Sequence, residues 1–201
     1  MMPFLFAAIL GYFLGCFQTA FVLGKFIGKI DIRDKGSNNA GASNVTIVMG
    51  WKYGVLTALV DILKAIVAVL IIKWLFPNSD YLYFVSGFFA IIGHIFPFYL
   101  KFKGGKGTAS IIGMALAIDF KIAAILIATI IIVTILTDYI AIGTLAIVII
   151  WPIAKYVAGY SIAGVGILCI IAVISIYKHL ANYKRIINKE ETGLRSLFNK
   201  N

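Results

Sequence analysis

The chain has 201 residues, of which 62% are hydrophobic and only 13% are charged, and its formal net charge is +10. A soluble domain of this length is nearer half apolar and a quarter charged, so the composition excludes an ordinary soluble protein. The apolar residues come in long runs. They predict an all-α integral membrane protein with one domain over residues 1–201, partnered by the lipid bilayer and not by nucleic acid. Its two cysteines lie inside these runs and are interpreted as small buried hydrophobes, not as a disulfide or metal pair.

The first apolar segment, Met1–Gly24, carries no charge until Lys25. Because the cations follow this segment instead of preceding it, they favour an external N-terminus and a cytoplasmic first loop. That loop, Gly24–Gly50, is rich in Gly, Asn and Ser, which indicates a loop or a broken short helix.

Six further apolar segments predict six further spans, of which the 108–118 segment is short and needs flanking loop residues to complete it. Most of the 18 Lys and Arg residues, from Lys25 to Lys200, then fall on the cytoplasmic side. The prediction is seven transmembrane helices, with the N-terminus outside and the C-terminus in the cytoplasm. The six segments are Trp51–Phe76, Tyr81–Tyr99, Thr108–Ile118, Ile122–Leu136, Ile140–Val157 and Tyr160–Tyr177.

A basic, glycine-rich loop separates two of these segments within Gly93–Gly107, GHIFPFYLKFKGGKG. Glycines let backbone N–H groups approach an anion closely, lysines neutralise it, and a helix N-terminus follows at once. The pattern indicates a phosphate-binding loop, and the alternative is a basic turn at the membrane surface. The candidate phosphate-binding residues are Lys103, Gly104, Gly105, Lys106 and Gly107.

A second polar cluster, GSNNAGASN, lies in the first loop. Its hydroxyls, amides and flexible backbone are suited to hold phosphate oxygens, which makes Asn39, Gly41 and Asn44 candidate ligands. The alternative is a solvated loop that caps a helix. The third cluster follows the last span, where His179 and Asn182 share a face at helical spacing. This face suits phosphate-ester binding or proton handling, or else the helix simply lies on anionic headgroups.

Ionisable residues elsewhere are few. His94 and His179 are the only histidines, and without a carboxylate cluster beside them no metal site is predicted. His94, next to a glycine, is interpreted as a structural hydrogen-bonding residue. Asp61 and Lys64 can pair on one face of a span, where they are functional candidates or a lock that holds the bundle together.

The three motifs GHIFPFYLKFKGGKGTA, DIRDKGSNNAGASNV and YKHLANYKRIINKEE resemble those of the bacterial membrane glycerol-3-phosphate acyltransferases that use acyl phosphate (the PlsY family). The resemblance runs nearly end to end. It implies a seven-span bundle in the cell (inner) membrane with its active site on the cytoplasmic side. It also implies catalytic roles for Ser37, His179 and Asn182, phosphate binding by the glycine loop, and a structural role for Glu191.

The implied reaction is attack of the glycerol-3-phosphate 1-hydroxyl on acyl phosphate, which gives 1-acylglycerol-3-phosphate and phosphate. Acyl phosphate is already activated, so the resemblance implies no acyl-enzyme, no metal and no cofactor. The enzyme's main task is to neutralise and orient two anions.

Several positions depart from the family pattern. Asn38 and Ala40 stand where the family has Gly and Pro, a family Gly near position 189 is replaced, and Ile47 stands where the family has a functional arginine. Because isoleucine cannot hold phosphate, either Lys35, Lys52 or Lys184 covers the site, or the chain is a paralogue that binds phosphate or lipid with weak or no acyl transfer. A small-anion transporter is a third, weaker alternative. Acyl-chain preference, oligomeric state and the group that accepts the hydroxyl proton stay open.

Overall fold

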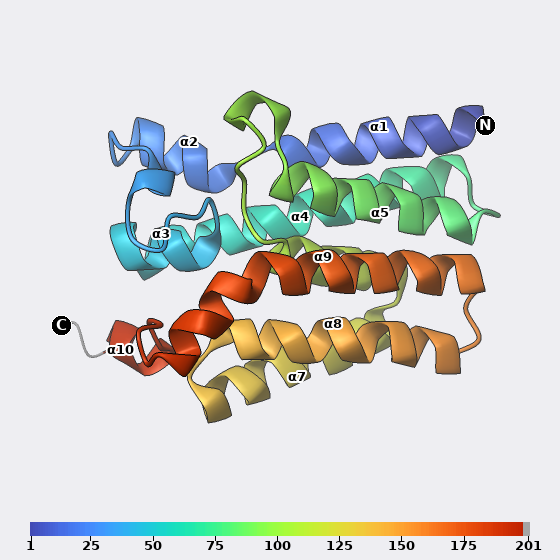
Figure 1. The fold of residues 1–201 in the computed structure, drawn as a ribbon. Coiled ribbons are helices and arrows are strands. Elements are labelled where there is room, and N and C mark those ends of the chain that lie inside the picture. Colours follow the sequence, from blue (N-terminus) through green and yellow to red (C-terminus); the bar gives the residue numbers. More distant parts are fainter. Residues whose placement is uncertain (199–201) are drawn as a thin grey trace. The chain divides into compact units, whose positions relative to one another are not determined.

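The computed structural model describes residues 1–198, and Lys200 lies outside them. All regular structure in that range is helical (Figure 1). Two of the elements, η1 and η2, are short 3-10 helices. The elements in order are α1 Met2–Cys16, α2 Thr19–Phe26, η1 Ile32–Asp34, α3 Ala42–Met49, α4 Trp51–Leu75, α5 Asp80–Ile95, η2 Phe98–Leu100, α6 Thr108–Ile118, α7 Phe120–Thr137, α8 Ile140–Val157, α9 Ile162–Ile187 and α10 Leu194–Phe198.

Six helical segments among residues 1–198 are long and apolar enough to cross a bilayer. The remaining predicted span, α6, has the expected bounds, but its 11 residues rise only about 16 Å, roughly half the thickness of the hydrocarbon core. The chain is therefore an all-helical membrane protein, while the count of seven spans and the direction of the termini stay predictions. The six segments are Met2–Phe26, Trp51–Leu75, Asp80–Leu100, Phe120–Thr137, Ile140–Val157 and Ile162–Ile187.

The first predicted span breaks between α1 and α2, where Phe17 has extended backbone angles. The break leaves carbonyl groups without helical partners, and such groups are costly in an apolar environment. Side chains from later in the chain satisfy them, since the Tyr99 hydroxyl donates to the Cys16 carbonyl at 2.9 Å and the Lys64 ammonium donates to the Phe17 carbonyl at 2.6 Å. The break between α1 and α2 is thus stabilised by specific hydrogen bonds.

The last long helix extends further than the sequence indicated. The predicted span ends at Tyr177, whereas α9 continues to Ile187. The helical spacing inferred for His179 and Asn182 is therefore confirmed, and both side chains are buried.

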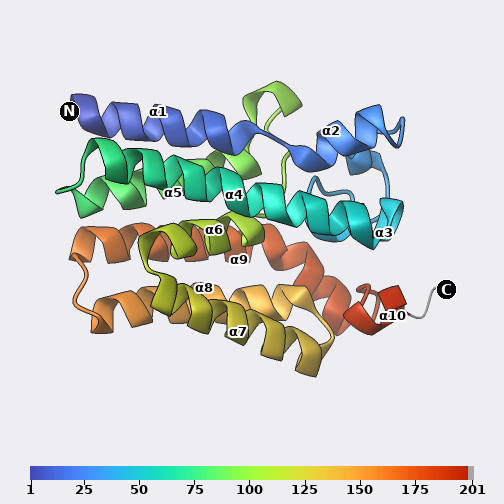
Figure 2. The same cartoon turned by 180° about the vertical axis from the view of Figure 1, so that it is seen from behind.

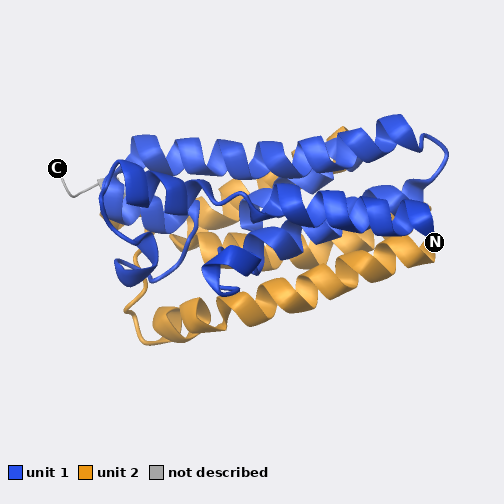
Figure 3. Ribbon diagram, turned by 90° about the horizontal axis from the view of Figure 1, so that it is seen from above, with its two compact units in different colours: residues 1–118 blue, residues 119–201 orange. Residues whose placement is uncertain are grey.

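The chain divides into two compact units, residues 1–118 and residues 119 onward (Figure 3). In unit 1, α1 and α5 run parallel and touch along their length. A Cβ atom at Gly11 would strike the Ser86 carbonyl, one at Gly15 would strike the Ala90 carbonyl, and one at Gly93 would strike α1. Glycines spaced four apart allow this close approach of two backbones inside a membrane.

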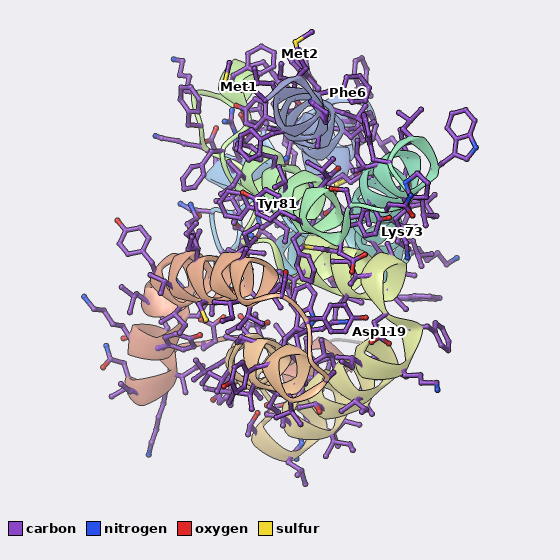
Figure 4. The ribbon with its side chains drawn as sticks, turned by 90° about the vertical axis from the view of Figure 1, so that its right-hand side faces the viewer. Met1, Met2, Phe6, Lys73, Tyr81 and Asp119 are labelled. Carbon is purple, nitrogen blue, oxygen red and sulfur yellow. The ribbon has the colours of Figure 1, made fainter. Side chains whose placement is uncertain are left out.

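Because α1 and α5 are parallel, the segments that follow them leave at the same end of unit 1 (Figures 1 and 2). Helix α6 runs beside the second half of α4, where Gly113 packs on the Ile62 carbonyl and Lys73 donates to the Ala117 carbonyl at 3.0 Å. The two polar loops of unit 1 are thus brought to the end opposite its N-terminus. Figure 4 views the N-terminal end, where it labels Met1, Met2, Phe6, Lys73 and Tyr81.

Unit 2 contains α7, α8 and α9 joined by short turns, with α10 packed at one end. Asp119 caps α7 by accepting bonds from the Lys121 and Ile122 amides, and it also pairs with the buried Lys155 ammonium at 3.0 Å. The turn between α7 and α8 is held to the C-terminal segment, because the Arg195 amide donates to the Asp138 carboxylate at 2.7 Å. Polar contacts therefore fasten both ends of this unit.

Candidate functional site

The loop before α3 is folded around the side chain of Asn44, which is 0% exposed. Its amide nitrogen donates to the carbonyls of Ile32, Lys35 and Asn39 at 2.8–3.0 Å, and its oxygen accepts the Ser37 amide at 2.7 Å. Both polar atoms of Asn44 are thus used within the loop. Asn44 therefore holds the loop that carries Ser37 and Asn39, and its phosphate contact stays a prediction.

The family glycine that is missing at position 38 is explained by backbone geometry. Asn38 has φ +56° and its neighbour Gly36 has φ +60°, both in the left-handed region. Asparagine is among the residues that enter this region most readily after glycine, so the substitution preserves the loop. Ser37 and Asn39, on either side, are both half-buried.

The glycine loop is packed against the end of α5. Gly104, Gly105 and Gly107 are buried, Lys106 is half-buried and Lys103 is exposed. The Gly104 amide donates to the Ile95 carbonyl at 3.1 Å, and the Gly105 amide donates to the His94 carbonyl at 3.0 Å. These two amides therefore already have partners within the chain, and phosphate binding at Gly104 and Gly105 stays a prediction. Lys103, Lys106 and the amino end of α6 remain as candidate phosphate-binding groups.

The glycines are required because the two polar loops of unit 1 touch. A Cβ atom at Gly104 would strike the His94 carbonyl, and one at Gly105 would strike the His94 ring and approach the Ala40 carbonyl to 3.0 Å. Gly107 has φ +95°, where any side chain is strained. The first and second clusters thus come together, as the sequence indicated.

Arg33 makes a second link between these loops, one that the sequence analysis did not identify. Its guanidinium pairs with the Asp31 carboxylate at 2.6 Å and donates to the Leu100 carbonyl at 2.9 Å. The Arg33 hydrogen bonds lower the pKa of Asp31 below its ordinary value. Arg33 lies inside the motif DIRDKGSNNAGASNV, but its residue type and spacing alone do not show that it reaches the second loop.

Beneath these loops, the ion pair expected between Asp61 and Lys64 is present, with a distance of 2.7 Å between the carboxylate and the ammonium. The His94 ring lies next to it, with Nδ1 at 2.9 Å from the Lys64 ammonium. His94 therefore makes the structural hydrogen bonds expected of it.

The third cluster belongs to unit 2. The His179 ring hydrogen-bonds through Nδ1 to the Ser175 carbonyl one turn earlier at 2.8 Å and stacks on Tyr183. Asn182 donates to one oxygen of Glu191 at 2.8 Å, and Arg185 donates to the other at 2.6 Å. Glu191 thus turns back to orient Asn182, in keeping with its expected structural role.

Lys189 lies just before the turn that brings Glu191 back to Asn182, and its φ is +61°. The family glycine was expected near this residue, and a left-handed backbone is the conformation that favours glycine. The approach of the third cluster to Ser37 and Lys106 stays a prediction. Among residues 1–198, no group of three or more His, Cys, Asp or Glu side chains is placed to hold a metal ion.

Comparison with known proteins gives consistent matches over almost the whole chain. The family described as glycerol-3-phosphate acyltransferase matches residues 5–189. Glycerol-3-phosphate acyltransferase 1 of Oceanobacillus iheyensis is 45% identical over 206 residues, which cover 99% of each chain. The glycerol-3-phosphate acyltransferase of Thermoanaerobacter pseudethanolicus is 34% identical, with 93% of each chain covered.

Two solved structures share the fold. The crystal structure of PlsY (YgiH), an integral membrane glycerol 3-phosphate acyltransferase, in its glycerol 3-phosphate form, has a TM-score of 0.89 and 30% identity over 95% of each chain. Its lysophosphatidic acid form has a TM-score of 0.86 and 29% identity over 96% of each chain.

Proposed function

This chain belongs to the glycerol-3-phosphate acyltransferase family, and from that premise we propose that it acylates glycerol-3-phosphate at the membrane. We propose acyl phosphate as the donor and 1-acylglycerol-3-phosphate, that is lysophosphatidate, with inorganic phosphate as the products. This is the first step of phospholipid synthesis. The observation that carries the proposal is the junction of the two polar loops, where Gly105 lies against Ala40 and Arg33 reaches Leu100.

The chemistry needs orientation more than a nucleophilic side chain. The 1-hydroxyl oxygen forms a bond to the acyl carbonyl carbon, the bond between that carbon and the phosphate oxygen breaks, and phosphate leaves with the electron pair. A substrate phosphate oxygen takes the hydroxyl proton. Two anions must approach each other for this, so neutralisation by fixed cations and alignment of the reacting atoms provide most of the acceleration.

The proposed roles follow the geometry. Lys103, Lys106 and the amino end of α6 neutralise and hold phosphate, since helix N-termini attract anions. The Ser37 hydroxyl hydrogen-bonds a substrate from the loop that Asn44 organises. The other residues proposed to line the phosphate-binding surface belong to the second cluster and to the glycine loop: Asn39, Gly41, Asn44, Gly104, Gly105 and Gly107.

His179 and Asn182, both in unit 2, are proposed to bind substrate. Because Nδ1 of a neutral His179 donates to the Ser175 carbonyl, the ring lone pair lies on Nε2, which can accept a bond from a glycerol hydroxyl. Asn182, fixed by Glu191, supplies a neighbouring amide.

We propose seven spans, with α6 as the short one, an external N-terminus and a cytoplasmic C-terminus, in the cell membrane. The cations of the first loop and of the glycine loop support this direction, because these loops follow two helices of unit 1, α1 and α5, that run parallel.

A second candidate function is favoured by Ile47, which is half-buried on α3 where the family arginine is expected. In that case the chain binds glycerol-3-phosphate or a lipid phosphate and turns it over slowly or not at all.

The test is an assay of the purified chain with acyl phosphate and labelled glycerol-3-phosphate, run beside acyl-CoA as a competing donor and beside Lys106→Ala. We expect lysophosphatidate from acyl phosphate only, and far less from the variant. Absence of product above the Lys106→Ala background rejects the enzyme. Calorimetric binding of glycerol-3-phosphate in such a sample would then support the binding protein instead.

A further inference from the structure

Three buried ionisable side chains lie directly under the glycine loop. Lys64 is 7% exposed, Asp61 2% and His94 3%. The Lys64 ammonium lies 2.6 Å from the Phe17 carbonyl, 2.7 Å from the Asp61 carboxylate and 2.9 Å from Nδ1 of His94. The ammonium hydrogen-bonds the Phe17 carbonyl and Nδ1 of His94, and its charge pairs with the Asp61 carboxylate.

This arrangement determines which nitrogen of His94 carries the proton. Since Lys64 donates to Nδ1, that nitrogen must accept, and the hydrogen of the neutral ring is on Nε2. Nδ1 is 3.5 Å from the nearest Asp61 oxygen, which is longer than its distance to Lys64. A doubly protonated ring would place two cations in contact in a buried site.

The Nε2 edge of His94 faces the glycine loop. A Cβ atom added to Gly105 would fall on Nε2, and the carbonyl of His94 accepts the Gly105 amide at 3.0 Å. On the other side of the loop, the Ser110 hydroxyl donates to the Asp61 carbonyl at 3.2 Å. The loop is therefore fastened on both sides to residues of this buried group.

We propose that Asp61, Lys64 and His94 are positioning residues for the phosphate-binding loop. Lys64 fixes the tautomer and the orientation of His94. The His94 ring and carbonyl in turn fix the positions of Gly104 and Gly105 against the end of α5. None of the three touches a reacting atom; they act through the placement of Lys103 and Lys106. The consequence for catalysis rests on the proposed function, whereas the tautomer and the loop placement do not.

A purely structural ion pair would hold α4 to its neighbours without any effect on the His94 tautomer. The two roles are separated by nitrogen NMR of the detergent-solubilised chain labelled with ¹⁵N-histidine, which gives simple spectra because the chain has only two histidines. We expect hydrogen on Nε2 in His94 and on Nδ1 in His179, and a His179→Gln variant assigns the signals. A His94 ring with hydrogen on Nδ1 overturns the proposal, and this measurement needs no variant of Lys64.

The role of Lys64 is tested in the double variant Asp61→Asn/Lys64→Met, which removes both buried charges together and avoids leaving one unpaired. We expect a mixture of His94 tautomers and faster hydrogen exchange in a peptide that covers residues 101–110. Lys73→Met is the matched control, because Lys73 lies on the same helix and donates to a carbonyl of α6. Unchanged tautomer and exchange in the double variant overturn the proposal.

The kinetic arm measures KM for glycerol-3-phosphate and kcat separately. We expect KM to rise about tenfold in the double variant, with a smaller change in kcat and with neither changed in Lys73→Met, because a displaced loop weakens anion binding first. A fall in kcat at constant KM contradicts a positioning role. If the chain has no acyl transfer activity, the NMR and exchange results still decide the structural part.

Discussion

At the scale of single residues, Ile47 is the departure with the clearest chemical consequence. The side chain lies on α3, directly after the loop that Asn44 organises, and carries no charge where the family pattern has a guanidinium. If the family arginine belongs at this position, the site lacks one of its cations.

Ile47→Arg should therefore tighten glycerol-3-phosphate binding or raise turnover by about 10- to 100-fold, since a charge-assisted hydrogen bond contributes about 1.5–3 kcal/mol. Steady-state kinetics and calorimetry measure this, with Val48→Arg on the same helix as the control. An unchanged or lower rate would mean that another cation, such as Lys35, Lys52 or Lys184, already serves this position.

Lys189 differs from Ile47, because it is expected to lower the stability of the folded chain through its backbone conformation. No side-chain contact is involved. A left-handed conformation costs a non-glycine residue roughly 1–2 kcal/mol, so Lys189→Gly should raise the free energy of unfolding by about 1 kcal/mol. Lys184→Gly, inside α9, should lower it by roughly the same amount. Thermal unfolding in detergent compares the two, and equal signs would contradict the argument.

At the scale of elements, the first polar loop depends on one side chain. Asn44→Ala leaves the Ser37 amide and three carbonyls without their partner, which we expect to destabilise the chain by about 1–3 kcal/mol and to raise KM for glycerol-3-phosphate. Ser43→Ala, an exposed neighbour, is the control. Equal proteolysis of the 32–44 loop in both variants would show that the Asn44 contacts matter little.

The link between the two loops also predicts a response to acid. The Arg33 contacts lower the pKa of Asp31 in the folded chain, so their stabilising contribution is complete above the unfolded value of about 3.9 and is lost as pH falls through the folded pKa. Melting temperatures recorded from pH 6 to pH 3 should fall more steeply for the unmodified chain than for Asp31→Asn. Parallel curves would exclude this source of acid sensitivity.

Elements differ in how far the sequence could predict them. Helices α4, α6 and α8 were placed to within a residue because their apolar runs end at glycine or at polar turns. The break at Phe17 was not predicted, since neither proline nor charge marks it, Gly15 is tolerated inside a helix, and its partners, Lys64 and Tyr99, come much later in the chain. The roles of Asn44 and of the Gly104 and Gly105 amides depend on tertiary contacts in the same way.

At the scale of the whole molecule, the residue types of the motifs predicted that the polar clusters lie together. Within unit 1 the glycine loop and the second cluster do make contact. What composition could not resolve is the number of crossings, because α6 is too short to count by length alone. Span number and terminal direction are linked, since an odd number places the two termini on opposite sides.

Reporter fusions test that link directly. With seven spans, a C-terminal fluorescent protein should be bright in the cytoplasm, and alkaline phosphatase fused to the N-terminus behind an export signal should be active outside. If the two reporters instead place both termini on the same side of the membrane, the number of crossings is even. Helix α6 would then be a re-entrant helix.

The interrupted first helix has a consequence for biogenesis. The Phe17 carbonyl has no donor until the ribosome has made α4 as far as Lys64, and the Cys16 carbonyl has none until Tyr99 has been added after α5. The amino-terminal segment must therefore stay beside the insertion machinery or near the headgroups until about half the chain has been translated. Its final shape is acquired late, although it is synthesised first.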